Sequence, residues 1–585
     1  MPESVPLHLR RYITKQDQSH YTAIDHAVWR YILRQLKNFL KDNAHESYLD
    51  GLEKTGITID EIPRIEDISS KLEKFGWRAL PVSGFIPPAA FMELQSLGIL
   101  PIASDMRSID HLLYTPAPDI VHEAAGHAPM LIQPEFAAYL KKYAQIAKKA
   151  LISFEDLEVY NAIRDLSDTK ENPKADPQDI RRAEERLQKA LQAVTHISEA
   201  ALLGRMNWWT AEYGLIGDLS RPKIFGAGLL SSVGEARWCL SDKVKKILLS
   251  LDCLNYSYDI TEPQPQLFVA RDFKHLSDVL EEMSHSMAYR TGGPGAIEKA
   301  ILARTVNTVQ FETGLQVSGE CKEMILDSRG ALAYLIFRGP CQICFKDLQL
   351  QGHGCDYHRE GFGTPVGPLR GYAGRSPASL SELEWAHFNL SNPGQVIQPG
   401  DEVRLEYSSD LVIQGTFRSW CKEKNQSLLM TLENAKATYH ERILFQPDWG
   451  AFDLSLADKV TSVYAGPADR RSFVENEDFE VAHVPRPQWS PSDLEQQRAY
   501  QTLRSARQND SSAIAFDDSI FHQFCEKHLL HFQKDWLFAL DAYEISILKN
   551  WLKSRDFLKK ILERLSKEQA SLKTLIDEGV QLLHK

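Results

Sequence analysis

Two histidines in the stretch PDIVHEAAGH, residues 118–127, have the types and spacing of metal ligands. The stretch is close to the H-E-x-x-H signature of zinc peptidases, in which histidines four residues apart share one face of an α-helix. Here His122 and His127 are five residues apart. An ideal α-helix, at about 100° per residue, would place them about 140° apart. They can share a metal only if the helix is broken or bulged between them, and Gly126 would permit this.

Two neutral imidazoles need a third ligand. Non-heme iron(II) oxygenases use two histidines and one carboxylate on one face of the metal, which leaves the other face open. The stretch MNWWTAEYGLIGD, residues 206–218, offers Glu212 among aromatic side chains. Burying this charge without a partner would be unfavourable, so the carboxylate is a candidate ligand. Zinc could use the same three residues, and two histidines that only pack in a core are the alternative.

The composition bounds the class of protein. The chain has 585 residues, enough for two or more domains of about 100–200 residues each. Its formal net charge of -12 argues against a large nucleic-acid surface. There is no apolar run of about 18 residues and no apolar signal-peptide core. The eight cysteines are mostly scattered, as in proteins of a reducing compartment. We therefore expect a cytoplasmic protein that binds neither membrane nor nucleic acid.

The spacing of apolar residues changes along the chain. Segments 20–42, 134–150 and 180–203 have helical periodicity, and the polar stretch over 165–179 is predicted to be a surface loop within a helical insertion. After about residue 315 apolar and polar residues alternate, as they do in strands. We predict a mainly α catalytic domain, then a β-rich domain, then a helical C-terminal region. Their boundaries are 1–315, 316–485 and 486–585.

Near the C-terminus, apolar residues recur every seven positions at Trp551, Leu558, Leu565 and Leu572. This pattern is typical of a helix that packs on its own domain, or of a coiled coil between copies of the chain. A homo-oligomer through the C-terminal helix is therefore the alternative to simple packing.

Four stretches together resemble the pterin-dependent aromatic amino acid hydroxylases, and they cover about residues 14–315. They are GWRALPVSGFIPPAAFMELQ (76–95), LLYTPAPDIVHEAAGHAPML (112–131), WWTAEYGLIGD (208–218) and FGAGLLSSVGEARWCLS (225–241). The resemblance implies a helical basket around a non-heme iron. Asn207 departs from the pattern, because many animal members have an aromatic residue there.

The resemblance also implies roles for individual residues. The iron(II) ligands would be His122, His127 and Glu212. Substrate binding would involve Arg107, Thr115, Asp119, Trp208, Gly228 and Ser231. Arg107 and Asp119 would hold the amino-acid carboxylate, Trp208 would pack against the substrate ring, and Ser231 would orient His122. Gly226 and Gly228 would let the backbone approach the substrate. The pterin, tetrahydrobiopterin or a related reduced pterin, would contact Gly84, Ile86, Phe91 and Glu123.

The implied activity is that of a monooxygenase that hydroxylates the ring of a free aromatic L-amino acid, with Fe(II), O2 and tetrahydropterin. Phenylalanine to tyrosine is the expected reaction, which would serve phenylalanine catabolism. The alternatives are tryptophan or tyrosine hydroxylation, a zinc metallopeptidase-like hydrolase, and a binding protein without catalysis on the same fold.

A second cluster of metal-ligand types lies in the β-rich domain. Cys341 and Cys344 have the spacing of zinc ligands, and His353, Cys355 and His358 follow. The spacing of the later group is irregular. These residues are therefore either a tetrahedral zinc site or ordinary residues of a β-domain.

Overall fold

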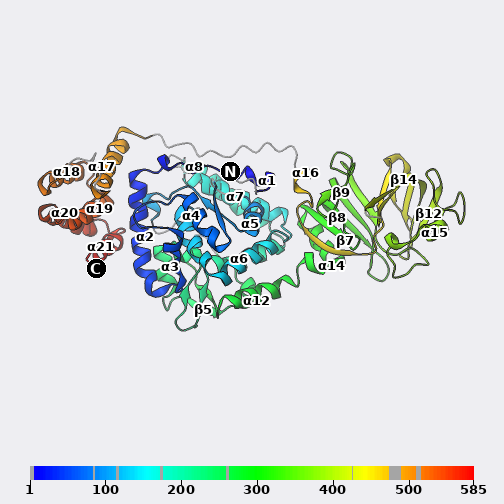
Figure 1. Ribbon diagram of the computed structural model, residues 1–585, viewed down its shortest axis with the longest axis horizontal. Coiled ribbons are helices and arrows are strands. Elements are labelled where there is room, and N and C mark those ends of the chain that lie inside the picture. Colours follow the sequence, from blue (N-terminus) through cyan, green and yellow to red (C-terminus); the bar gives the residue numbers. More distant parts are fainter. Residues whose placement is uncertain are drawn as a thin grey trace.

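The computed structural model describes residues 5–82, 86–112, 118–171, 176–258, 263–423, 426–473, 489–508 and 516–584. Along the longest axis of the molecule, a mainly helical region lies between a β-rich region and a group of C-terminal helices (Figure 1). Among the described helices, none is long and apolar enough to cross a membrane.

The central region is organised around α2 (Ala23–Asn43), the helix predicted over 20–42. A capping box formed by Thr22 and Asp25 starts this helix. Its apolar residues at helical intervals are buried in the core. Further helices of this region are α1 (Leu7–Arg10), α3 (Ser47–Thr55), α4 (Ile65–Leu72), α5 (Pro88–Ser96), α6 (Pro134–Ala147), α9 (Glu199–Asn207), α10 (Ala227–Leu230), α11 (Val233–Cys239), α12 (Phe273–Ser284) and α13 (Ala288–Thr291).

Two small sheets support the segments between these helices. β1 (Arg78–Val82) pairs in parallel with β2 (Ile99–Ala103), which is buried along its whole length. A second sheet has the order β4-β3-β6-β5. Its strands are β3 (Leu215–Ile216), β4 (Lys223–Ile224), β5 (Lys245–Leu248) and β6 (Gln266–Ala270). β3 follows shortly after Glu212, so this sheet anchors the chain on that side of the site.

The surface loop predicted over 165–179 is wrong at both ends, and residues 172–175 between them lie outside the described residues. α7 (Phe154–Glu171) continues through residues 165–171 and packs against α8 (Pro177–Ala193). α8 begins at an Asp176 cap with Pro at its first position, and it contains no buried residue. The helix predicted over 180–203 covers most of α8, which ends at Ala193, and the start of α9 at Glu199. The end of α7 was missed because its polar residues lack the apolar periodicity that reveals a helix.

The β-rich region begins with β7 (Val306–Phe311), upstream of the boundary predicted at residue 315. One sheet has the order β10-β9-β8-β7-β17, with β11 also paired to β9, and a second has the order β12-β13-β14-β15, with β16 paired to β14. Two apolar cores lie in this region, and each contains residues of both sheets. α14 (Gly293–Ala303) covers β8 and β17. The remaining strands are β8 (Leu315–Leu326), β9 (Leu332–Phe345), β10 (Leu348–Gln349), β11 (Gly361–Pro365), β12 (Glu402–Glu406), β13 (Leu411–Glu423), β14 (Gln426–Tyr439), β15 (Arg442–Phe445), β16 (Phe452–Ser455) and β17 (Val460–Ala465).

The C-terminal helices pack on α2, near the start of the chain, so segments far apart in the sequence lie side by side (Figure 1). Arg30 of α2 donates two hydrogen bonds to the buried Asp541, with N–O distances of 2.9 and 3.0 Å. Apolar residues of both segments belong to one core. These helices are α17 (Pro491–Gln508), α18 (Asp518–His531), α19 (Trp536–Leu548), α20 (Leu552–Glu568) and α21 (Lys573–Leu582).

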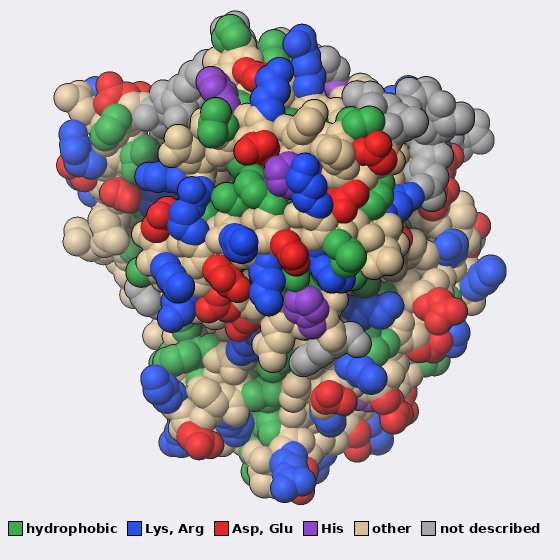
Figure 2. Space-filling model, turned by 90° about the vertical axis from the view of Figure 1, so that its left-hand side faces the viewer, with side chains coloured by type: hydrophobic (Ala, Val, Ile, Leu, Met, Phe, Trp, Pro, Cys, Tyr) green, Lys and Arg blue, Asp and Glu red, His purple; other side chains and the backbone are tan. Residues whose placement is uncertain are grey.

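The seven-residue repeat of the C-terminal region faces this core. Leu558 and Leu565 of α20 are fully buried, and α20 packs against α18, α19 and α21. The outer face of this end of the molecule carries cationic and anionic side chains intermixed (Figure 2). The repeat is thus used inside the chain.

Candidate active site

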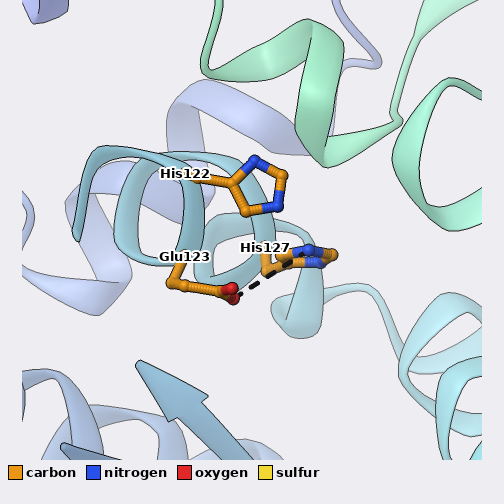
Figure 3. A group of neighbouring side chains, drawn as sticks. All are labelled: His122, Glu123 and His127. Carbon is orange, nitrogen blue, oxygen red and sulfur yellow. Dashed lines mark ion pairs between the residues drawn. The ribbon is translucent and has the colours of Figure 1, made fainter. Parts of the chain in front are cut away.

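The segment that carries both histidines is a π-helix, η4 (Val121–His127). In a π-helix the backbone hydrogen bonds join residues five apart, so residues at that spacing stand on one face. The N–H of Ala128 donates to the carbonyl of Glu123 across this spacing. The rings of His122 and His127 accordingly point to the same side, with centroids 5.0 Å apart (Figure 3). This is the departure from α-helical geometry that the five-residue spacing requires.

The carboxylate comes from a second π-helical segment, η6 (Trp208–Glu212), which continues α9. Glu212 Oε2 lies 3.3 Å from His122 Nε2, and Glu212 Oε1 lies 3.4 Å from His127 Nε2. Burial raises the pKa of Glu212, but the charge and hydrogen bonds of the two imidazoles outweigh it and hold the pKa below its ordinary value. The two π-helical segments thus place both imidazoles beside the carboxylate of Glu212.

Glycines allow the segments that carry these ligands to touch. A Cβ added to Gly126 would lie 2.6 Å from the carbonyl oxygen of Ala227, and one added to Gly226 would lie 2.5 Å from that of Glu212. At Gly228 it would lie 3.0 Å from the ring of Tyr213. The close approach of η4 to α10 therefore requires Gly126, whose φ is not left-handed. Gly226 and Gly228 approach the backbone and ring beside Glu212, a contact that the sequence did not indicate.

Ser231 fixes the orientation of His122. Its hydroxyl donates to the carbonyl of Ala227 at 2.7 Å, so its oxygen accepts from the Nδ1–H of His122 at 3.2 Å. Nδ1 then carries the proton, and Nε2 presents its lone pair to the side where Glu212 lies. Ser231 thus has the contact expected of the group that orients this ligand.

Arg107 and Asp119 form a buried bidentate pair. Arg107 Nε and Nη2 each lie 2.7 Å from an oxygen of Asp119. Asp119 also accepts the backbone N–H of His122 at 3.0 Å, which ties the pair to η4. Burial raises the pKa of Asp119, but Arg107 outweighs this and lowers it. Among the described residues, Arg107 Nη1 has a single contact, at 3.4 Å to the Ser231 carbonyl, so it keeps capacity to bind a further carboxylate.

The ligand side chains open into a cavity of about 1070 Å³, which is lined by Arg107, Phe91, Trp208, Glu123 and Gly228 among others. Drug-sized ligands occupy pockets of about 300–1,000 Å³, so there is space for two small molecules. Ile86, expected beside the pterin, packs instead in a small apolar cluster with α5. Gly84 and Thr115 lie outside the described residues.

Trp208 forms one wall of this cavity. Its ring stacks on Tyr213 and Tyr258, with centroids 4.5 and 4.3 Å apart. Its indole N–H is buried and has no hydrogen-bond partner among the described residues. The neighbouring Trp209 is fully buried and donates to the carbonyl of Tyr256 at 3.1 Å, so it packs in the core.

Glu123 lies beside the ligand set in the same cavity (Figure 3). Its Oε2 is 4.0 Å from His127 Nε2 and has no hydrogen-bond partner among the described residues. Burial raises the pKa of Glu123 to about 8. This carboxyl group is thus available to a polar ligand in the cavity.

Asn207 is a neighbour of the site whose contact the sequence did not predict. Its side-chain N–H donates to Glu212 Oε1 at 3.2 Å, so it contacts the oxygen that faces His127. The five-residue spacing of Asn207 and Glu212, which is also that of the two histidines, is the sequence feature that could have indicated this contact.

The β-rich region supplies part of the cavity wall, also unforeseen. Residues 304–306, 338–340 and 465–467 line it together with Arg470. Arg470 Nη1 lies 2.8 Å from Glu93 Oε2, and His8 Nε2 lies 3.1 Å from the same oxygen. Glu93 belongs to α5, the helix that carries Phe91. An ion pair thus joins the β-rich region to the helix on which the pterin is expected to stack.

The donor set fits a divalent transition metal. Ligand atoms at right angles around one metal, about 2.1 Å from it, lie about 3 Å apart. The contacts of Glu212 with His122 and His127 are 3.3 and 3.4 Å, close to this value. The Nδ1 of His127 is buried without a hydrogen-bond partner among the described residues, which leaves its Nε2 as the nitrogen engaged in the cluster.

Known proteins identify the family of this region. The profile of the biopterin-dependent aromatic amino acid hydroxylases matches residues 11–151 and 191–291. These segments belong to that family. The gap in the match, residues 152–190, contains α7 and most of α8. The hairpin that these helices form and the residues after 291 therefore lie outside the match.

Individual relatives are phenylalanine-4-hydroxylases. The enzyme of Pseudomonas aeruginosa is 28% identical over 278 residues, covering 46% of this chain and 89% of that protein. The enzyme of Rattus norvegicus is 30% identical over 271 residues, covering 45% of this chain and 49% of that protein. A structure of the Chromobacterium violaceum enzyme with iron(III) and 7,8-dihydrobiopterin is 27% identical, covers 47% of this chain and 85% of that one, and has a TM-score of 0.38.

Proposed function

We propose that this protein is a pterin-dependent phenylalanine 4-monooxygenase, which converts free L-phenylalanine to L-tyrosine with Fe(II), O2 and a tetrahydropterin. The observation that carries the proposal is the placement of His122 and His127 on one carboxylate, that of Glu212, inside a cavity. Two histidines and one carboxylate are the ligand set of iron(II) oxygenases, and the family match supports the pterin.

His122, His127 and Glu212 would hold the iron, with Ser231 fixing the ring of His122. With iron(II) and a tetrahydropterin bound, one oxygen atom of O2 goes to the aromatic ring and the other to the pterin. The residues of this chain position the reactants. Arg107, held rigid by Asp119, offers Nη1 to the amino-acid carboxylate, and Trp208 offers a flat wall to the ring.

The pterin side of the cavity rests on Phe91 and Glu123. Phe91 lines the cavity from α5, where its ring can stack on a planar heterocycle. The unpartnered Oε2 of Glu123 can hydrogen-bond to a polar group of that ring system. The apolar walls exclude water from the reacting atoms.

The other functions are less well supported. A zinc peptidase would need histidines four apart on an α-helix, with the intervening glutamate as general base. Here the histidines are five apart on a π-helix, and the relatives are hydroxylases. Tryptophan or tyrosine hydroxylation would use the same iron and pterin groups, so substrate comparison separates these activities.

The proposal is tested by metal analysis and turnover of the full-length protein. We expect one iron(II) per site and oxygen uptake that requires both a tetrahydropterin and phenylalanine, with tyrosine as product. Uptake without pterin, or peptide hydrolysis by the zinc form, would contradict it. Glu212→Gln should lose iron and turnover together. Glu235→Gln is the matched control, because Glu235 also lines the cavity but bonds to Tyr213 at 2.9 Å.

Self-association of the chain through its C-terminal helix stays a prediction. Sedimentation of the full-length protein at several concentrations would test it.

A further inference from the structure

The β-rich region contains a second convergence of metal-ligand side chains. His353 and His358 lie on the connection between β10 and β11, and Asp453 lies on β16. His353 Nδ1 is 3.2 Å from His358 Nε2, and one ligand atom of each of the three residues lies within 4.8 Å of the others. His358 and Asp453 are 7% and 5% exposed. None of the three lines the hydroxylase cavity.

This set differs from the cysteine-containing zinc site that the sequence suggested. The thiol of Cys341 lies 3.5 Å from the carbonyl of Arg338, and that of Cys344 lies 3.3 Å from Gln342 Oε1. Burial raises the pKa of both thiols to about 12, so they are not thiolates at neutral pH. The third ligand is instead Asp453, about a hundred residues further along the chain, which no local spacing pattern could reveal.

The charge of Asp453 argues for a cation. Among the described residues its hydrogen-bond partners are hydroxyls, Thr431 at 2.6 Å and Tyr357, and neither carries a positive charge. A buried carboxylate without a cation is unfavourable. Metal ions bind histidine through a neutral ring nitrogen, so His353 and His358 can supply the remaining ligands.

The geometry fits zinc. Tetrahedral ligands at about 2.0–2.1 Å from Zn²⁺ lie about 3.3 Å apart, close to the 3.2 Å between the two nitrogens. The Thr431 hydroxyl donates to Asp453 and fixes its orientation, as outer hydrogen bonds do around metal sites. β11 belongs to one sheet and β16 to the other, and the two strands are in contact.

We propose that His353, His358 and Asp453 bind a Zn²⁺ ion that fastens the β10–β11 connection to β16 and so joins the two sheets. His353 is only half-buried, so the cluster lies near the surface of the β-rich region. The ion neutralises the buried carboxylate and separates the two facing nitrogens. This site is independent of the hydroxylase chemistry.

The test is zinc stoichiometry in the full-length chain. Protein stripped with a chelator is dialysed against Zn²⁺ alone, freed of loose metal, and its zinc content is measured by mass spectrometry. Zinc can use the same two histidines and carboxylate as iron(II), so we expect two Zn²⁺ per wild-type chain. Asp453→Asn and His358→Gln should each retain one. His387→Gln, an exposed histidine of the same region that contacts Tyr372, should retain two.

A wild-type protein that retains no zinc, or that retains a single Zn²⁺ which is lost in Glu212→Gln, overturns the proposal. Two equivalents that persist in a folded Asp453→Asn protein also overturn it. As a second measurement, added Zn²⁺ should raise the melting temperature of the stripped wild-type and His387→Gln proteins. The shift should be reduced in Asp453→Asn and His358→Gln. An equal shift in all four proteins would contradict the assignment.

Discussion

At the scale of single residues, Ser231 is the group whose removal best tests how the iron site is oriented. Ser231→Ala deletes the acceptor for the Nδ1–H of His122 and leaves the ligand in place. Loss of such an outer hydrogen bond lowers metal affinity or activity by about 10–100-fold. We expect a decrease of that size, measured as the iron(II) dissociation constant and as tyrosine formation.

The adjacent serine provides the control for this prediction. Ser232 accepts from the backbone N–H of Glu235 and caps α11, whereas Ser231 accepts from His122. Ser232→Ala should lower stability by about 0.5–2 kcal/mol as a lost helix cap, with iron affinity unchanged. Equal loss of iron in both variants would mean that the effect is structural.

Arg107 tests substrate binding. Arg107→Lys keeps the positive charge but removes the planar fork that pairs with Asp119 and presents Nη1 to the cavity. A hydrogen bond to a charged group contributes about 1.5–3 kcal/mol, so KM for phenylalanine should rise by about 10–100-fold. The iron content and the KM for pterin should change little. An unaltered KM for phenylalanine would remove Arg107 from the substrate site.

The sequence predicts the chemistry of these residues better than their contacts. The candidate metal ligands can be found in the sequence because histidines, and glutamates among aromatic residues, are few. The five-residue spacing of His122 and His127 already requires a bulged helix. The contact of Asn207 with Glu212 was not predicted, because it depends on the π-helical turn of η6, which residue types alone do not predict. The pairing of Arg470 with Glu93 joins residues nearly four hundred positions apart, beyond any local pattern.

At the scale of elements, the site depends on how closely η4 approaches α10. Gly126→Ala would place a methyl group 2.6 Å from the carbonyl oxygen of Ala227, a backbone atom that cannot move aside easily. Overpacking of this kind costs about 1–3 kcal/mol. We expect this loss in urea unfolding, together with weaker iron binding, because η4 carries both histidines.

A helical glycine elsewhere gives the opposite expectation. A Cβ on Gly295 in α14 would meet no atom within 4 Å. Gly295→Ala should therefore leave iron binding unchanged and stabilise the protein by up to about 1 kcal/mol, because alanine favours the helix. If Gly126→Ala were as harmless as Gly295→Ala, the contact between η4 and α10 would not be tight.

Elements were predictable where one face is buried. α2 follows from apolar residues at helical intervals, and the alternating strands of the β-rich region follow from the pleat. The second half of α7 was missed, because its polar residues carry no such signal, whereas α8 lies largely within the helix predicted over 180–203. The packing of the C-terminal helices on α2 was also not predicted, because it depends on buried charged pairs between segments far apart in the sequence.

At the scale of the whole molecule, the β-rich region closes one side of the hydroxylase cavity. Arg470→Ala removes its ion pair with Glu93 on α5. A partly exposed pair contributes up to about 1 kcal/mol, so the KM for pterin should rise by no more than about fivefold. Exchanging the two charges, with Glu93→Arg and Arg470→Glu together, should recover part of the loss.

The control for this pair is another arginine of the β-rich region. Arg404 pairs with Glu406 at 3.0 Å and does not line the cavity, so Arg404→Ala should leave the KM for pterin unchanged. If Arg470→Ala has no more effect than Arg404→Ala, the β-rich region covers the cavity without influencing what binds there.

The docking of the C-terminal helices should make stability depend on pH through Asp541. Burial raises the pKa of Asp541, but Arg30 and Arg507 outweigh this and hold it below its ordinary value. An unfolded aspartate has a pKa of about 3.9, so the charged pair stabilises the fold fully above about pH 5 and loses this contribution as pH falls through the lower, folded pKa. Asp541→Asn removes the charge at every pH and leaves two buried arginines short of a partner. The substitution should lower the free energy of unfolding by about 3–5 kcal/mol at pH 7. Its difference from wild type should shrink in acid, as measured by urea unfolding from pH 7 to pH 3.

Asp556→Asn, on the exposed face of α20, is the control, and its free energy of unfolding should stay within about 0.5 kcal/mol of wild type at every pH. A deficit in Asp541→Asn that is equally large at pH 3 would show that the side chain acts through its shape and not through its charge.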